Sequence, residues 1–367
     1  MSNNLLGLIF SNANAKKIPE LTSLRTMGSV PFGGKYRMID FPLSNMVNSR
    51  INNVGILARS HYLSLMDHVG SGSTWDLSKR RSSLTVLPPF GDTHFENMVE
   101  AIYGIRDYLY SCEEEYVLMT NSDIVTSINY HPAFQNHLKN KADITIIYKN
   151  MTIPDKMENP VIVEMDSSKK VTGLFIKPGS AGVYNLSIDM IIIKKELLNS
   201  IVHYGISENK TDLKRLLSDS VSKYNVFGYE HTGYCAIISS IAEYFNINMS
   251  LMDKDIRHEL FNKENPIYTK IRDDMPCRYG LNSSVRNSLV AQGCVINGEV
   301  DNCLLFKGVT IGKGSKVSNS IIMQDTSIED DVNLSYVIID KDVQIKSGRA
   351  LSGYKSYPIY IAKRSVI

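Results

Sequence analysis

The 367-residue sequence lacks the features of an exported, membrane-spanning or disulfide-stabilised protein. It contains no apolar run of about 18 residues, which a membrane-spanning helix would need. Its N-terminus lacks the basic segment that begins a secretion signal. The five cysteines are scattered without C-x-x-C spacing, which argues against a disulfide framework or a zinc site. We therefore expect a cytoplasmic protein without membrane contact.

The sequence also lacks an excess of charge of one sign. Forty Lys and Arg residues are offset by 38 Asp and Glu residues, so the formal net charge is +2. Overall charge therefore does not favour a nucleic-acid partner. Apolar residues make up 43% and charged residues 21%, as in ordinary globular proteins. A chain of this length predicts roughly two domains.

Residues 1–255 alternate short apolar runs with amphipathic segments. The apolar runs predict four buried strands, over Leu5–Phe10, Val54–Leu57, Tyr116–Thr120 and Ile144–Tyr148. Apolar residues three and four apart predict a helix over Asn97–Tyr110. Strands that alternate with helices indicate βαβ units, and so an α/β domain with a mostly parallel sheet.

One connection, from Gly70 to Glu96, is unusually long. It holds the only tryptophan, Trp75, and a basic cluster of Lys79, Arg80 and Arg81. Loops of this length are usually functional or disordered. Two interpretations stay open, a solvated mobile loop and a substrate lid or effector surface.

A different period begins near Asn287. Apolar residues recur every six positions in two series, Leu305, Ile311 and Val317, then Ile322, Ile328 and Leu334. This period fits a β-solenoid whose coils have three short faces, each with one inward aliphatic residue. We expect a hexapeptide β-helix over residues 287–367 that serves assembly, preceded by a linker over residues 256–286.

Residues 32–49 read FGGKYRMIDFPLSNMVNS, a very specific string. It resembles the glucose-1-phosphate adenylyltransferases of bacterial glycogen synthesis. The similarity continues through WDL at 75–77, VLPPF at 86–90 and the C-terminal repeats. The resemblance implies a Rossmann-like nucleotidyltransferase domain with a mixed sheet, followed by a left-handed β-helix. It also implies a reaction, in which glucose-1-phosphate attacks the α-phosphate of ATP to give ADP-glucose and pyrophosphate.

The phosphate-binding positions of that family are altered here. Its loop Gly-Gly-x-Gly-Thr-Arg-Leu aligns with residues 12–18, which include Asn12 and Asn14 and hold no glycine. Glycine lets the backbone approach the phosphates closely. Lys17 keeps the charge of the family's arginine but loses its planar fork. Met27 replaces a phosphate-facing lysine, and a methionine cannot offset phosphate charge.

The metal and sugar positions that the resemblance implies are altered as well. Asp123 matches one magnesium ligand, but Ile237 stands at the position of the second aspartate. An aliphatic side chain cannot ligate a hard cation, so Asp123 would bind magnesium weakly or simply cap a turn. Lys177 and Ser187 are what remains of the sugar-phosphate pocket.

This pattern implies a chain that keeps the scaffold and has lost the chemistry. It is similar to the GlgD-type regulatory subunits found beside a catalytic partner in some Gram-positive bacteria. We expect no competent catalytic residue, no tightly bound cofactor, and Mg²⁺ only with residual activity. The expected partner is a catalytic glucose-1-phosphate adenylyltransferase subunit in a hetero-tetramer. Two alternatives stay open, an independently active enzyme with altered metal and phosphate ligation, and a sensor of a sugar phosphate or nucleotide.

Arg25, Lys35 and Arg37 are the candidate effector residues. In the family this region helps to bind a phosphorylated sugar that acts as an effector. The other interpretation is that these cations are solvated or salt-bridged surface groups.

Overall fold

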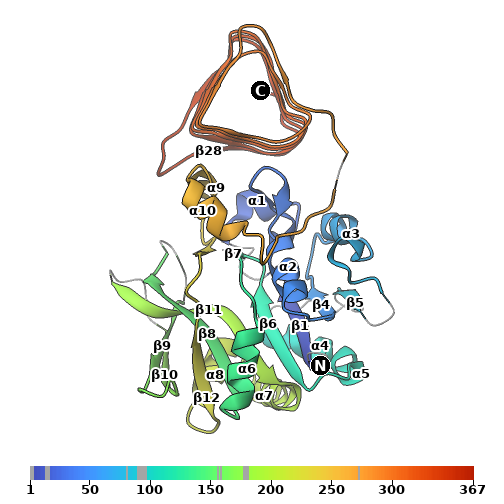
Figure 1. The fold of residues 1–367 in the computed structure, drawn as a ribbon, viewed down its shortest axis with the longest axis vertical. Helices are drawn as coiled ribbons and strands as arrows, with labels where there is room; N and C mark the ends of the chain where they lie inside the picture. The colour runs from blue at the N-terminus through green and yellow to red at the C-terminus, as the bar shows by residue number, and fades with distance from the viewer. Residues whose placement is uncertain are drawn as a thin grey trace.

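An α/β domain and a β-helix of triangular cross-section make up the chain (Figure 1). The computed structural model describes residues 4–12, 17–79, 82–88, 97–154, 157, 159–176, 182–271 and 273–367. Within these ranges, no helix has the length and apolar character needed to cross a membrane.

A mixed sheet of nine strands forms the centre of the α/β domain. Its strands are β1 (Leu5–Phe10), β4 (Asn53–Leu57), β5 (Ser83–Leu87), β6 (Tyr116–Asn121), β8 (Ile144–Thr152), β9 (Val161–Met165), β10 (Val171–Ile176), β11 (Val183–Lys194) and β12 (Val226–Glu230). The order is β10-β9-β11-β6-β1-β4-β5, and β8 pairs with β11 and β12. Strand β1 runs parallel to β4 and β6, whereas β11 runs antiparallel to β6 and β8. The predicted α/β class and mixed sheet are confirmed.

All four predicted strands are present, and β1 has the predicted bounds. The helix predicted over 97–110 is divided into α4 (Met98–Gly104) and α5 (Arg106–Ser111). Asn97 caps α4, because its side-chain oxygen accepts a hydrogen bond from the Glu100 amide at 3.0 Å.

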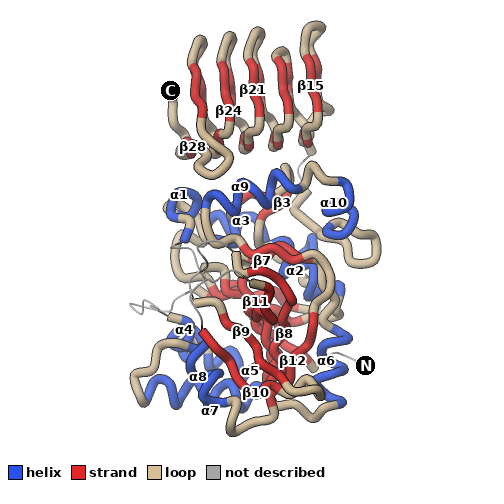
Figure 2. The backbone as a smooth tube through the Cα atoms, turned by 90° about the vertical axis from the view of Figure 1, so that its left-hand side faces the viewer, coloured by secondary structure: helices blue, strands red, loops and turns tan. Residues whose placement is uncertain are grey.

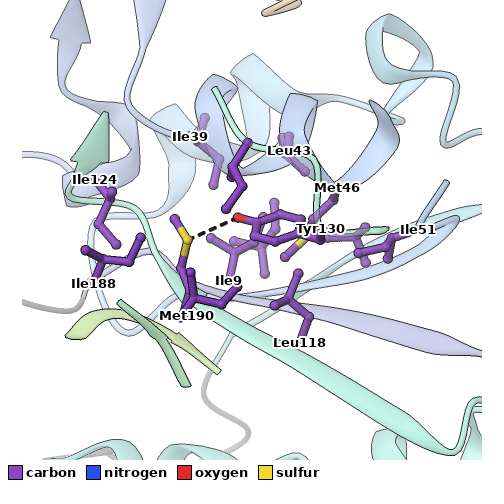
Figure 3. Packing of buried hydrophobic residues seen from close by; sticks show 14 of the residues in the cluster. Ile9, Ile39, Leu43, Met46, Ile51, Leu118, Ile124, Tyr130, Ile188 and Met190 are labelled. Carbon is purple, nitrogen blue, oxygen red and sulfur yellow. Dashed lines mark hydrogen bonds between the residues drawn. The ribbon is translucent and has the colours of Figure 1, made fainter. Parts of the chain in front are cut away.

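Helices cover both faces of the sheet and enclose two separate cores. One core contains residues of α2 (Asp40–Asn48), α3 (Leu63–Val69) and α6 (His131–Lys139); the other contains residues of α4, α5, α7 (Lys195–Ser207) and α8 (Leu213–Ser220). Alternate residues of β1 enter opposite cores, as the pleat of a strand requires, so that Leu5 and Ile9 face the first and Leu6 and Leu8 the second. Figure 3 shows the first core, where the Tyr130 hydroxyl donates to Met190 Sδ at 3.6 Å.

The first part of the long connection is only partly solvated. Trp75, in the short helix η3 (Ser73–Trp75), is 1% exposed and donates from its indole N–H to Ser44 Oγ at 3.3 Å. Strand β5 lies in the same connection and was missed, because as an edge strand it buries only Leu87 and shows no clear alternation. The solvated-loop interpretation is therefore wrong at Trp75 and Leu77, which are 1% and 2% exposed, although most other residues from 70 to 79 are exposed. Arg80, Arg81 and residues 89–96 lie outside the described residues.

The C-terminal part is a left-handed β-helix with three faces of five parallel strands each, stacked coil upon coil (Figure 2). The first face holds β14 (Arg278–Tyr279), β17 (Val295–Ile296), β20 (Thr310–Ile311), β23 (Ser327–Ile328) and β26 (Gln344–Ile345). The second holds β15 (Ser284–Arg286), β18 (Glu299–Asp301), β21 (Lys316–Ser318), β24 (Asn333–Ser335) and β27 (Ala350–Ser352). The third holds β16 (Leu289–Val290), β19 (Leu304–Leu305), β22 (Ile321–Ile322), β25 (Val337–Ile339) and β28 (Ile359–Ile361).

The six-residue period explains this architecture. The aliphatic residues of both predicted series lie in successive strands and are at most 3% exposed. At one corner, Asn302 and Asn319 adopt positive φ values of 52° and 45°, a conformation that asparagine tolerates well. Asn302 Nδ2 donates to Asn319 Oδ1 at 2.6 Å, which ties neighbouring coils together.

The β-helix begins earlier than the expected boundary at residue 287. Its first strands, β14 and β15, lie in the expected linker, which also contains most of α10 (Lys254–Leu260). The boundary at 287 is thus too late. The first coil escaped notice because Arg278 and Tyr279 are exposed and Val285 is only half-buried, so the inward pattern is weak there.

A third core joins the two parts of the chain. It contains residues of α1 (Pro19–Thr22) and α9 (Ile241–Ser250) together with residues on one outer face of the β-helix, Leu304, Phe306, Ile321, Met323 and Ile338. Beside it, Arg25 Nη2 donates to both oxygens of Asp340, at 2.9 and 2.7 Å. The side chains are only 6% and 1% exposed. The Tyr360 hydroxyl also donates to Asp340, at 2.8 Å.

We predict that Arg25→Met lowers the free energy of unfolding by about 3–5 kcal/mol, because Asp340 would stay buried without its cation. Urea unfolding followed by circular dichroism measures this change. Lys316→Met is the control, since the Lys316–Glu299 pair of the β-helix is 3.5 Å long and its side chains are 63% and 54% exposed. It should cost under about 1 kcal/mol. Equal effects of the two changes would contradict the importance of the Arg25 pair.

Candidate functional site

Polar residues gather where β1 and β6 end, side by side in the sheet. Ligands of α/β sheets bind beyond the carboxyl ends of parallel strands. Ser11 and Asn12 follow β1, and Ser122 and Asp123 follow β6. The Ser122 hydroxyl lies 3.3 Å from the carbonyl oxygens of both Phe10 and Ser11, so the two strand ends are tied together.

The described part of the predicted phosphate loop makes structural contacts. Asn12 Oδ1 accepts a hydrogen bond from the Arg59 amide at 2.7 Å, which joins the end of β1 to the segment after β4. Asn14 lies outside the described residues, as does Lys177 of the sugar-phosphate pocket. Lys17 is half-buried and lines a cavity considered below.

Met27 belongs to the core that joins the two domains. It begins the short helix η2 (Met27–Ser29) and is 0% exposed. The next residue, Gly28, donates its amide to the Ser11 carbonyl at 3.1 Å. A Cβ atom at Gly28 would lie 2.6 Å from Ser11 Oγ, so a side chain at this position would require the Ser11 hydroxyl to move. The replacement of the family's lysine by Met27 has therefore added an apolar group to the core.

The magnesium that the resemblance implies does not fit the residues present. Asp123 is buried, and its carbonyl accepts a hydrogen bond from the Ile238 amide at 2.9 Å. Ile237, in β13 (Cys235–Ile237), pairs in register with Ile124 of β7 (Ile124–Thr126) and lies in the first core. Across the described ranges, no group of three or more His, Cys, Asp or Glu side chains is arranged to hold a metal ion.

Two charged residues that the sequence did not single out as a pair meet at this edge of the sheet. Asp189 lies at an irregularity of β11, with a φ of 51°, and receives a hydrogen bond from Asn121 Nδ2 at 3.2 Å. Lys214, in the first turn of α8, places its ammonium 3.0 Å from Asp189 Oδ1 and 3.2 Å from Oδ2. Ser187 supports the irregularity, because its hydroxyl accepts from the Asp189 amide at 3.4 Å.

The electrostatics favour a charged Lys214. Burial lowers the pKa of Lys214, whereas the carboxylates of Asp189, Asp123 and Asp212 raise it. Together the carboxylates outweigh burial, so the net pKa lies above its usual value. The ammonium is therefore retained at neutral pH. A signal for half of this pair was available in the sequence. Residues 187–189 align with a Ser-Met-Gly motif of the family that the chain resembles, so Asp189 stands where that motif has glycine. Lys214 lies 25 residues further along the chain, so its pairing with Asp189 could be recognised only from the folded structure.

A cavity of about 300 Å³ opens beside this pair. It is lined by Lys17, Met98, Asn159, Thr211, Asp212, Leu213 and Lys214. The structure thus brings Lys17, at the family's phosphate-loop arginine, to the same cavity as Lys214.

The three candidate effector residues do not share one environment. Arg25 is held by Asp340, and Arg37 donates to the carbonyl and hydroxyl oxygens of Ser64 at 2.6 and 2.9 Å. Lys35 is exposed, with its ammonium 4.9 Å from the centre of the Tyr36 ring.

A further cation, Lys341 of the β-helix, lies near Arg25 and Arg37. Burial lowers its pKa to about 7, with further lowering by Arg37, Arg25 and Lys363 against the opposing effect of Asp340. Sequence analysis missed Lys341 because it lies more than 300 residues from Arg25 and reaches the junction only through the docking of the β-helix.

Comparison with known proteins identifies the family. The profile of the family described as Nucleotidyl transferase matches residues 6–232, and that of the GlmU-like, C-terminal hexapeptide matches residues 275–354. Glucose-1-phosphate adenylyltransferase of Halalkalibacterium halodurans is 31% identical over 86% of this chain and 85% of its own length. The chain belongs to the glucose-1-phosphate adenylyltransferase family of glycogen biosynthesis.

Other relatives of this family match almost the whole chain. The glycogen biosynthesis protein GlgD of Bacillus subtilis is 33% identical over 99% of this chain and 96% of its own length. Glucose-1-phosphate adenylyltransferase of Clostridium perfringens is 29% identical over 99% of this chain and 96% of its own length. The resemblance carried by residues 32–49 is thereby confirmed.

We predict that Lys341 lowers the free energy of unfolding by an amount that depends on pH. The folded state releases the Lys341 proton near pH 7, whereas an unfolded lysine keeps it to about pH 10.5. The unfolded state therefore binds more protons in this window, and stability rises with pH through it. Lys341→Met should gain stability over the parent protein at pH 6 and lose that advantage towards pH 10, measured by urea unfolding across pH. Arg37→Met should raise the pKa of Lys341, so the increase of stability with pH should begin at higher pH. If that increase stays at the same pH, it does not come from Lys341.

Proposed function

We propose that this chain is a regulatory subunit that is non-catalytic, or very weakly active, on its own. It acts by modulating a catalytic glucose-1-phosphate adenylyltransferase partner, which makes ADP-glucose and pyrophosphate from ATP and glucose-1-phosphate. The observation that carries the proposal is the burial of Ile237 in the β13–β7 pair, at the position of a metal-binding aspartate in the family.

The phosphate-binding side supports the same proposal. Met27, at the position of a phosphate-facing lysine, is fully buried in a core, and among the described residues that line the cavity Lys17 stands at a cationic position of the family. Loss of a single preorganised electrostatic group typically lowers the rate by about 10²–10³. Such losses are not additive. Even so, we expect very little turnover when a metal ligand and a cationic side chain that binds phosphate are both missing.

One observation favours the alternative, an active enzyme with altered metal ligation. Asp189 adds a carboxylate near Asp123, where a replacement ligand would be useful. Against this, Asp189 is already bound by the Lys214 ammonium at 3.0 Å. The alternative therefore needs that ion pair to open, and the regulatory proposal does not.

The proposed assembly is a hetero-tetramer with the catalytic subunit. Large apolar side chains are exposed in the segment that leads into the β-helix and in its first coil, namely Ile271, Met275, Tyr279 and Leu281. Exposed large apolar side chains mark a protein contact where they form a contiguous patch. A subunit without turnover can still act if it binds one of two partner conformations more tightly. No tightly bound cofactor is proposed.

A phosphorylated sugar is the proposed effector, at the junction of the two domains. Arg37 and Lys341 lie there, with Lys35 exposed nearby in the sequence, and a phosphate would offset the mutual repulsion of these cations. Arg25 contributes only if its pair with Asp340 opens, because both carboxylate oxygens already accept from it.

The decisive test is pyrophosphate release from ATP, glucose-1-phosphate and MgCl₂. The purified chain should release no pyrophosphate alone, and it should change the rate or effector response when it is mixed with the catalytic homologue of the same organism. Size-exclusion chromatography with light scattering should show the mixed tetramer. Robust release by the chain alone would overturn the proposal in favour of the active-enzyme alternative, and an unchanged rate in the mixture would remove the regulatory role.

We predict that Ile237→Asp, which restores the missing carboxylate, does not create activity. The phosphate-facing lysine would still be absent, and Lys214 would still hold Asp189. Circular dichroism checks that the variant folds, since the change places a carboxylate in a core. As the matched control, the reverse change to Ile at the equivalent aspartate of the catalytic subunit should lower its rate by at least about 10². Substantial turnover by the restored variant alone would contradict this description of the site.

A further inference from the structure

The site retains two carboxylates near each other, yet it does not fit the divalent cation that the family implies. We infer that the Lys214 ammonium takes the place of that cation, so that Asp123 and Asp189 are neutralised by the chain itself. This inference deepens the proposed regulatory function and rests on it.

The geometry places the ammonium where a cation would be shared. Asn121 ends β6, two residues beyond Met119, the last β6 residue that pairs with β11, and its side-chain amide binds one Asp189 oxygen at 3.2 Å. The Lys214 ammonium lies between 3.0 and 3.2 Å from both oxygens of that carboxylate. The Asp189 carboxylate is therefore bound by two donors of the chain itself, Asn121 and Lys214.

Asp123 belongs to the same electrostatic unit. It follows β6 by two residues and is 1% exposed, so its charge is poorly screened by water. Its carboxylate acts on Lys214 and helps to keep that side chain protonated. The ammonium thus binds Asp189 directly and acts on Asp123 through its charge, and a divalent cation likewise offsets the charge of carboxylate oxygens.

An internal ammonium has an advantage over a metal ion from solution. Mg²⁺ gives up its water reluctantly and needs near-ideal octahedral geometry. Lys214 is delivered by the first turn of α8, and its side chain is only 30% exposed beside an Asp189 side chain that is 18% exposed. The buried Ile237 removes the oxygen that would favour the metal in this competition.

The test measures Mn²⁺ binding by the loss of the free-ion electron paramagnetic resonance signal, with no turnover involved. The parent chain should bind Mn²⁺ no more tightly than Asp123→Asn does. Lys214→Met should bind Mn²⁺ at least about tenfold more tightly than the parent, because two carboxylates would then lack their cation. MnCl₂ should also raise the unfolding temperature of Lys214→Met and leave that of the parent unchanged.

Lys210→Met is the matched control. Lys210 lies four residues before Lys214 and pairs with Asp219 at 3.5 Å, but the side chains are 43% and 58% exposed. This variant should bind Mn²⁺ like the parent. A gain in Lys214→Met no larger than in Lys210→Met would overturn the inference.

The comparison of the parent chain with Asp123→Asn keeps the inference testable even if Lys214→Met fails to fold. Tighter Mn²⁺ binding by the parent than by Asp123→Asn would overturn it. This result would not affect the regulatory proposal. That proposal is overturned by a different result, pyrophosphate release by the chain alone.

Discussion

The buried ion pair between Arg25 and Asp340 is the interaction on which the arrangement of the two domains depends. Arg25 lies between α1 and η2 of the α/β domain, and Asp340 follows β25 of the β-helix. A pair this deeply buried tolerates only one relative position, because displacing either partner leaves a charge without compensation. The surrounding apolar core supplies most of the attraction, and the ion pair selects the geometry.

Several positions in the α/β domain and at its junction with the β-helix differ from the motifs of the family. At Met27 and Ile237 the expected charged residues are replaced by apolar ones that lie in cores. At Asp189 and Lys214 two opposite charges bind each other. At Met27, Ile237 and Asp189 the side chain makes a contact within the protein where the family motif has a residue of another kind.

Much of the fold was predictable because it follows from periodic patterns. The buried strands β1, β4, β6 and β8 are continuous apolar runs, and the six-residue period of aliphatic residues predicts the β-helix. Strand β5 and the first coil escaped detection because edge positions bury few side chains and lose the pattern. The losses at Met27 and Ile237 were visible against a family motif. Pairs such as Lys214 with Asp189, or Lys341 with the arginines, are created by tertiary contacts that no local pattern records.

The position of Trp75 has a spectroscopic consequence. It is the single tryptophan, and its indole N–H meets Ser44, whose hydroxyl also accepts from the Tyr268 amide at 2.8 Å. Tyr268 belongs to the extended segment that leads from α10 to the β-helix. The intrinsic fluorescence of the whole chain therefore arises mainly from a place where this connecting segment is anchored to α2. Its emission is a natural reporter of whether the β-helix and the α/β domain move as one body when a partner binds.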